Sequence, residues 1–310
     1  GRRGARRRLD LAARRLPLTP RTAGGVFQKN FYFLARRFVA GERIEDAIAA
    51  VRELNAHGMS ASLDFLGEDV ESRDAAVRTR ETYTEILNAI ASSGVDSNVS
   101  VKLSAMGLLF DEHFALENLN AIVERAAGNR DPFVRIDMEG FTILEPTLRV
   151  FHQEFARHRN VGPVLQAYLK RTPGDVDDAI ALGARVRLCK GAYNEGSEVA
   201  YKAMPEIRMQ YLKLARRLLT NGTYPGIATH DRRLIAAIKE FVATERIARD
   251  RFEFQMLYGV RPRIQRQIAS EGYRLRIYVP FGTHWAAYFY RRVVERRENA
   301  LFALSSIFSR

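Results

Sequence analysis

The chain has 310 residues, 46% of them hydrophobic, and a formal net charge of +13. The hydrophobic content suffices for a buried core, and no apolar run approaches the roughly 20 residues that span a bilayer. The single cysteine, Cys189, excludes an intramolecular disulfide framework and a multi-cysteine zinc site, and it indicates a reducing compartment such as the cytoplasm.

Much of the positive charge lies near the start of the sequence, in "RRGARRR", "ARR" and "LARR". No RNP, helix-turn-helix or zinc-finger signature accompanies it, so nucleic acid is not an expected partner. Two interpretations remain: a solvated basic arm without a partner, or peripheral contact with the acidic inner face of a membrane. Residues 1–58 are predicted to form this basic helical arm and a lead-in helix, "ERIEDAIAAVRELNAHG", and residues 59–310 one further domain.

Short apolar or β-branched runs follow the lead-in helix and alternate with amphipathic helical segments. The predicted strands are 60–68, 98–107, 133–140, 162–170, 185–193, 224–230, 252–259 and 275–282. Strands that alternate with helices form a parallel sheet, and eight such units predict an α/β fold, the (β/α)8 TIM barrel. A doubly wound sheet is the alternative, but no glycine-rich nucleotide turn follows the first strand.

Polar residues recur at or near the ends of these strands, where the active sites of such barrels lie. In chain order they are Asp64, Glu68, Lys102, Asp137, Gln166, Arg187, Lys190, Tyr193, Thr229, His230, Glu253, Gln255 and Tyr278. Each alone has a structural explanation, such as a snorkelling lysine or a buried ion-pair partner. Together they are difficult to assign to packing, because strands that are buried on both faces are normally continuous apolar runs.

The charges of these residues narrow the chemistry. Lys102, Arg187, Lys190, Arg291 and Arg292 outnumber the acids expected at the same end, which favours a carboxylate or phosphate ligand. No His/Asp cluster has metal-ligand spacing, so no metal is expected. From the residues alone, an enzyme that uses Lys102 for a Schiff base or a phosphate, and a non-enzymatic basic binding module, both remain open.

The motifs in this order resemble the proline dehydrogenase family, in its monofunctional bacterial form and as the corresponding domain of the bifunctional proline-utilisation enzymes. The matching segments are "LDFLGE", "SVKLSAMG", "RIDMEG", "LQAYL", "VRLCKGAY", "ATHD", "FEFQMLYG" and "YVPFGTHWAAYFYRRVVERREN". The resemblance implies a distorted barrel whose last helix lies over the mouth. It also implies noncovalent FAD, hydride transfer from C5 of L-proline to flavin N5, and a membrane quinone as electron acceptor.

The resemblance also implies roles for individual residues. Asp137, Arg187 and Tyr278 match catalytic positions, with Arg187 near flavin N5, Asp137 below the substrate and Tyr278 against the substrate ring. Tyrosine at 278 points to proline, because relatives that prefer hydroxyproline differ there. The residues that match flavin contacts are Met138, Gln166, Arg187, Lys190, Gly191, Ala192, Thr229 and His230.

The remaining matches concern the substrate. Lys102, Arg291 and Arg292 match the cations that bind the proline carboxylate, and Tyr193 matches a second wall of the pocket. Glu295 matches a residue that fixes one arginine of the pair, and Glu68 matches an acid that pairs with the first arginine as a gate. Arg296 and Arg297 are expected to be ordinary solvated charges. The segment from Tyr278 to Arg291 is two residues shorter than in the bifunctional enzymes, as in the monofunctional ones.

Overall fold

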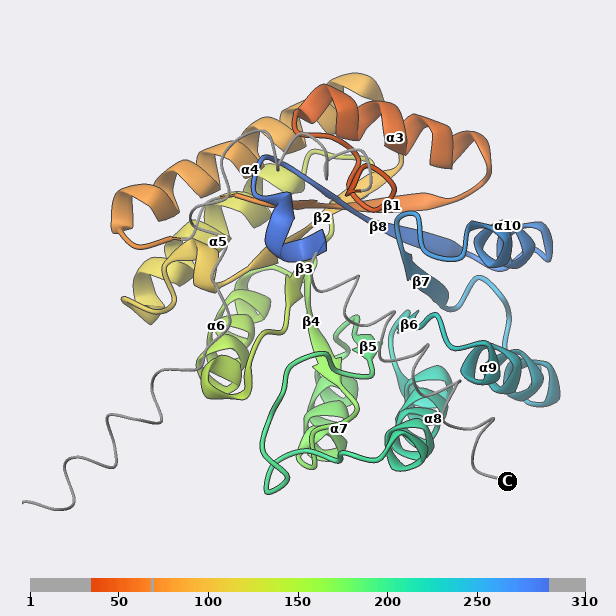
Figure 1. The fold of residues 1–310 in the computed structure, drawn as a ribbon. Coiled ribbons are helices and arrows are strands. Elements are labelled where there is room, and N and C mark those ends of the chain that lie inside the picture. Colours follow the sequence, from red (N-terminus) through yellow and green to blue (C-terminus); the bar gives the residue numbers. More distant parts are fainter. Residues whose placement is uncertain (1–34, 68–69, 290–310) are drawn as a thin grey trace, which may run out of the picture.

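A closed ring of parallel strands forms the centre of the structure, a computed structural model that describes residues 35–67 and 70–289 (Figure 1). Each strand pairs with the next one in the sequence, and the last strand pairs with the first. The strands are β1 Ser60–Phe65, β2 Ser97–Lys102, β3 Val134–Asp137, β4 Val161–Gln166, β5 Arg187–Cys189, β6 Gly226–Ala228, β7 Glu253–Leu257 and β8 Leu275–Phe281. The predicted eight-stranded α/β barrel is confirmed.

Helices surround this ring on its outer side (Figure 1). They are α3 Ile44–Ala56, α4 Arg73–Ser93, α5 Glu112–Ala126, α6 Leu144–Arg157, α7 Thr172–Leu182, α8 Met204–Asn221, α9 Arg232–Thr244 and α10 Pro262–Ser270, with the 3-10 helices η2 Ser104–Met106 and η3 Phe141–Ile143. Ser72, Asp111 and Asp231 cap α4, α5 and α9 by accepting hydrogen bonds from first-turn N–H groups. Outward-facing strand residues such as Val101 and Ile277 are fully buried and belong to one continuous core.

The observed strands are shorter than predicted, mainly at their C-terminal ends. The segment predicted as a strand over 185–193 contains only β5, Arg187–Cys189, and the one predicted over 224–230 contains only β6, Gly226–Ala228. The ladder ends where the chain leaves the ring for the next helix, and Gly191 already has a φ of +110°. Several polar residues predicted on strands therefore lie on the loops at the barrel mouth.

The chain turns after β8 and starts the last helix at the C-terminal end of β1. Gly282 has a φ of +126°, and a Cβ there would lie 2.6 Å from the carbonyl oxygen of Leu66, so this turn requires glycine. The next residues pack in a small cluster with Phe38 and Leu66, and Trp285 Nε1 donates to Glu42 Oε1 at 3.0 Å. Residues 290–310, which contain the rest of the helix predicted over the mouth, lie outside the described residues.

The lead-in helix is observed as α3, which lies against β1 and β8 (Figure 1). The predicted basic arm lies largely outside the described residues, so the division into 1–58 and 59–310 stays a prediction. Among the helices in the described ranges, none is both long and apolar enough to cross a bilayer.

Candidate active site

Arg187 lies at the centre of the polar residues inside the barrel. Its guanidinium donates to Asp137 Oδ1 on β3 at 2.6 Å, to Ser100 Oγ on β2 at 3.1 Å and to Gln255 Oε1 on β7 at 2.5 Å. The guanidinium carbon lies 5.3 Å from the ring centre of Tyr278 on β8. Four strands thus fix one buried cation, whose side chain is only 8% exposed.

Asp137 joins this cation to the aromatic residue of β8. The Tyr278 hydroxyl donates to Asp137 Oδ2 at 2.8 Å, while Asp137 Oδ1 accepts from Arg187. Burial and the carboxylates of Asp137 and Asp64 raise the pKa of Tyr278 well above its ordinary value. The phenol is therefore neutral and acts as a hydrogen-bond donor, and the three residues predicted as catalytic form one bonded group.

Lys102 ends β2 and lies in register with Asp137 on β3. Its Nζ lies 2.6 Å from Asp64 Oδ1, and Asp64 is 1% exposed. Burial alone would lower the pKa of Lys102, but the charges of Asp64 and Asp137 outweigh burial and raise it. The lysine is thus held as an ammonium at the barrel mouth, where it can bind an anionic group.

A second group of predicted residues lies on the loops after β5 and β6. Lys190 Nζ lies 3.5 Å from Asp231 Oδ2, which also accepts from Arg208 Nε at 2.7 Å. Burial opposes ionisation of Asp231, but Arg208 and Lys190 outweigh burial and lower its pKa. His230 Nε2 accepts from the Leu257 N–H at 2.8 Å, and Thr229 Oγ1 accepts from the Asp231 N–H at 3.1 Å. These bonds fix the side chains at the start of α9.

The remaining predicted cofactor residues lie at the end of β4 or just after β3 and β5. The Gln166 amide is 3% exposed and donates to the carbonyl oxygens of Met138 and Glu139 at 3.4 and 3.3 Å. Gly191 and Ala192 lie on the loop after β5, as does the half-buried Tyr193. These residues follow strands whose C-terminal ends lie at the same end of the barrel as Arg187 and Lys102.

Two observations test whether these residues suit a flavin. Gln166 Oε1 is buried and has no hydrogen-bond partner among the described residues, as expected of an acceptor that awaits a ring N–H. Arg187 uses three of the five N–H groups of a guanidinium on described residues, so two can donate to an anionic ring edge. Lys190 adds a cation suited to a phosphate. The set of donors and acceptors therefore fits a flavin nucleotide.

Some predicted site residues cannot be placed. Glu68, Arg291, Arg292 and Glu295 lie outside the described residues, so the predicted gate and carboxylate clamp stay predictions. Within the described ranges, no cluster of three or more His, Cys, Asp or Glu side chains is arranged for a metal ion. Cys189 is half-buried at the end of β5, and burial raises the pKa of its thiol to about 11, so this thiol is unreactive near neutral pH.

The structure adds residues that had no predicted role. Asp64 had been noted only as a polar residue on its strand, and it proves to be the partner of Lys102. Ser100 does not stand out in the sequence of its strand, and its bond to Arg187 becomes apparent only in the closed barrel. Ser104, on η2, bonds Glu139 through both its N–H and its Oγ, which ties the loops after β2 and β3 together.

The expectation that Glu253 lies near the mouth is wrong. It is the first residue of β7, at the opposite end of the barrel, where its Oε1 accepts from Arg276 Nε on β8 at 2.8 Å. Arg276 also lies 3.0 Å from Asp131. Side chains alternate between the two faces of a strand, so inward-facing residues occur at both ends of the barrel. The sequence pattern alone does not distinguish a residue at the N-terminal end, the floor, from one at the C-terminal end, the mouth.

This floor pair should contribute strongly to stability. Burial opposes ionisation of Glu253, but Arg276 outweighs it and lowers the Glu253 pKa below 4.5. Its stabilising contribution is therefore present above pH 4.5 and is lost as the pH falls through the lowered value. Glu253→Gln should lower the unfolding free energy by about 3 kcal/mol, because it leaves a buried arginine short of a partner. Denaturant titrations between pH 3 and pH 7 measure both the loss and the flatter acid dependence.

The exposed ion pair between Glu112 and Arg149 is the matched control. Glu112→Gln should change the unfolding free energy by less than about 1 kcal/mol, because water screens surface pairs. Equal losses in the two variants would contradict a special role for the floor pair.

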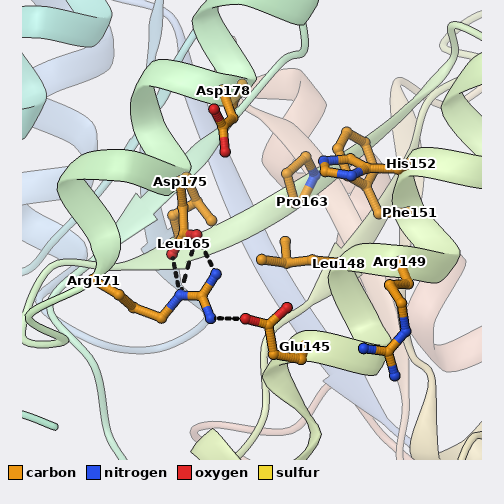
Figure 2. A pocket seen from close by; sticks show the side chains of 11 residues that line it. Glu145, Leu148, Arg149, Phe151, His152, Pro163, Leu165, Arg171, Asp175 and Asp178 are labelled. Atoms are coloured by element: carbon orange, nitrogen blue, oxygen red, sulfur yellow. Dashed lines mark hydrogen bonds and ion pairs between the residues drawn. The ribbon is translucent and has the colours of Figure 1, made fainter.

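A surface hollow of about 160 Å³ lies on the outer side of β4, between α6 and α7 (Figure 2). Arg171 spans it, pairing with Asp175 at 2.7 Å and with Glu145 (Figure 2). Pro163 and Leu165, which face outward from β4, form part of its wall. None of the lining residues belongs to the group around Arg187, so this hollow between two helices is not a candidate for catalysis.

Comparisons with known proteins identify relatives of this chain. A family model described as "Proline dehydrogenase" matches residues 47–304. Proline dehydrogenase 1 of Bacillus subtilis subsp. natto is 42% identical over 273 residues, which cover 88% of this chain and 90% of the relative. Proline dehydrogenase of Deinococcus radiodurans is 39% identical over 286 residues, which cover 90% of this chain and 92% of the relative.

A solved structure is also similar. Proline utilization A (PutA) from Bdellovibrio bacteriovorus, inactivated by N-propargylglycine, superposes with a TM-score of 0.81 at 26% identity. The match covers 87% of this chain and 33% of the PutA chain, so this chain corresponds to about a third of that larger protein. The family match spans the described strands from β1 to β8, together with the segment that contains both unplaced arginines. The chain therefore belongs to the proline dehydrogenase family.

Proposed function

We propose that this chain catalyses the FAD-dependent oxidation of L-proline to Δ1-pyrroline-5-carboxylate and passes the electrons to a membrane quinone. Membership of the family makes the chain an oxidoreductase that acts on proline, in the first step of proline catabolism. The observation that carries the finer proposal is the bonded group of Asp137, Arg187 and Tyr278 at the barrel mouth. It joins a fixed cation to an aromatic wall.

The substrate carboxylate would bind to the ammonium of Lys102, which its ion pair with Asp64 keeps charged. Arg291 and Arg292 are proposed to complete the carboxylate site, with Glu295 holding one of them and Glu68 acting as a gate. The rings of Tyr278 and Tyr193 would form two walls around the apolar ring of proline. The substrate is then held by its charged end while its ring carbons remain available for oxidation.

Oxidation of proline removes a hydride from C5 and a proton from the ring nitrogen, and it leaves a C5=N double bond. Noncovalently bound FAD would supply the hydride acceptor at N5. Arg187 would lie where negative charge develops, and its three bonds to the barrel fix it there before the reaction. Met138, Gln166, Lys190, Gly191, Ala192, Thr229 and His230 are the residues proposed to hold the cofactor beside Arg187.

The alternative use of Lys102 as a Schiff-base nucleophile is disfavoured. A lysine nucleophile must be a neutral amine near pH 7, which requires a lowered pKa. Lys102 instead has a raised pKa and a carboxylate 2.6 Å away. Its environment suits anion binding.

The basic N-terminal arm is proposed to serve electron transfer. Quinones reside in membranes, whose inner face is anionic, and a polybasic segment is attracted to such a surface. Peripheral contact through this arm would bring the reduced enzyme close to its acceptor.

Product analysis tests the proposed reaction. Purified protein supplied with FAD, L-proline and a water-soluble quinone should yield a product two hydrogen atoms lighter than proline, detected by mass spectrometry. Hydroxyproline is the matched substrate control, and it should react far more slowly, because Tyr278 is proposed to pack against the substrate ring and would leave no room for the extra hydroxyl. Absence of this product with several quinones and artificial acceptors would contradict the proposal.

A further inference from the structure

A continuous polar network runs beneath the proposed active site, from the mouth to the floor of the barrel. Arg187 Nε donates to Gln255 Oε1 at 2.5 Å, and Gln255 Nε2 donates to Glu253 Oε1 at 2.5 Å. The same Glu253 oxygen accepts from Arg276 Nε at 2.8 Å. We call Arg187, Gln255, Glu253 and Arg276 the interior network. All four are at least 93% buried, so water screens these contacts little.

The two charged neighbours determine the orientation of the Gln255 amide. Arg187 Nε carries a hydrogen and can only donate, so the amide oxygen must face it. The ionised Glu253 carboxylate can only accept, so the amide NH₂ must face that side. Rotating the amide by half a turn would set donor against donor and acceptor against acceptor. The glutamine thus has one allowed orientation, in which it holds the Nε side of the guanidinium.

The adjacent strand leaves room for this amide. Gly226 on β6 lies in register with both Arg187 and Glu253. A Cβ at Gly226 would meet the Gln255 side chain at 2.5, 2.8 and 3.3 Å, and these are its three nearest contacts. The space beside Gly226 is therefore occupied by the amide of the interior network.

We propose that Gln255 is a positioning residue for the oxidation, which it serves by fixing Arg187 at its Nε side with the support of Glu253 and Arg276. This inference rests on the proposed function, because Arg187 is the cation placed beside the flavin there. Asp137 and Ser100 hold only the two terminal nitrogens of Arg187. Without the Gln255 contact the guanidinium can tilt about its bonds to Asp137 and Ser100. Its remaining N–H groups then no longer point in one fixed direction.

The main test compares Gln255→Met with Gln265→Met in the FAD-loaded enzyme. Methionine keeps the length of the side chain but removes both hydrogen bonds. Gln265 on α10 is the matched control, because its exposed fraction is also 4%. It donates two hydrogen bonds outside the barrel interior, to the carbonyl oxygens of Leu257 and Val260. The readouts are the reduction potential of the bound flavin, kcat, KM for proline and the melting temperature.

Gln255→Met should shift the equilibrium between oxidised and reduced flavin about tenfold toward the oxidised form, which is about 30 mV for a two-electron couple. The value of kcat should fall about tenfold, the size of one lost hydrogen bond to a charged group, while KM stays within about twofold. Gln265→Met should lower the melting temperature without moving the potential. A wild-type potential in Gln255→Met would overturn the inference.

Gly226→Ala provides a second test of the role of Gln255, and it removes no polar group. Its new methyl group must displace the Gln255 amide, so the potential should shift in the same direction as in Gln255→Met. In the double variant, Gly226→Ala should add no further shift, because its effect passes through Gln255. Equal shifts in the presence and absence of Gln255 would overturn the inference. If Gln255→Met does not fold, Gly226→Ala alone decides the case, and a wild-type potential in that single variant would overturn the inference.

Different results would overturn the proposed function and the role of Gln255. A wild-type protein that folds but takes up no FAD would remove the proposed function and this inference together. A wild-type protein whose flavin is reduced by proline, combined with unchanged potentials in Gln255→Met and Gly226→Ala, would overturn the role of Gln255 alone.

Discussion

Arg187→Met is expected to lower kcat/KM for proline by about 10²–10³-fold, the usual cost of removing one preorganised charge stabiliser. The substitution removes the cation that four strands hold, and it leaves Asp137 with only the Tyr278 hydroxyl as partner among the bonds described above. Steady-state kinetics with L-proline, on protein loaded with FAD, measures the loss.

Arg187→Lys is the informative companion variant. It keeps the positive charge but cannot bond Asp137, Ser100 and Gln255 in one plane, so its activity should lie between those of the wild type and Arg187→Met. If Arg187→Met retained kcat/KM within tenfold of the wild type, the proposed role of this residue would be wrong.

Substitution of Arg291 and Arg292, the two arginines predicted to bind the proline carboxylate, is expected to act on affinity. Arg291→Met and Arg292→Met should each raise KM for proline by about 10- to 150-fold, which corresponds to the roughly 1.5–3 kcal/mol of a hydrogen bond to a charged group. The value of kcat should change less, because the carboxylate is bound in the ground state and in the transition state alike. Kinetics over a wide range of proline concentrations separates the two parameters.

The neighbouring arginines provide the control. Arg296→Met and Arg297→Met remove the same charge from the same segment and should leave KM unchanged, because these residues are expected to be solvated. If all four variants raised KM equally, general attraction of an anion would explain the result, and the specific clamp would be contradicted.

The barrel itself was predictable, because eight alternating units leave few possible topologies. The strand ends were not, because a polar residue such as Lys190 or His230 does not reveal whether it ends a strand or begins a loop. The ladder stops at Cys189 and at Ala228, just before these residues. Hydrogen bonding to neighbouring strands decides such boundaries, and that information is not local in sequence.

The membership of the site was also predictable in part. Asp137, Arg187 and Tyr278 were expected together, and the structure bonds them to one another. Their further bonds were not predicted, because each partner comes from a distant strand. Ser100, which had no predicted role, lies 87 residues from Arg187, and Gln255, expected only as a polar residue near a strand end, lies 68 residues from it. The register of the closed barrel brings these residues together, and a linear pattern of polar positions cannot supply it.

We propose that this protein oxidises proline through a bound flavin at the mouth of the barrel. Anaerobic addition of L-proline to the purified, FAD-loaded protein tests it most directly, with the visible flavin absorption band as the readout. We expect the band to bleach with L-proline and to return when a quinone is added. A folded protein that takes up no FAD, or whose flavin stays oxidised at saturating L-proline, would contradict it.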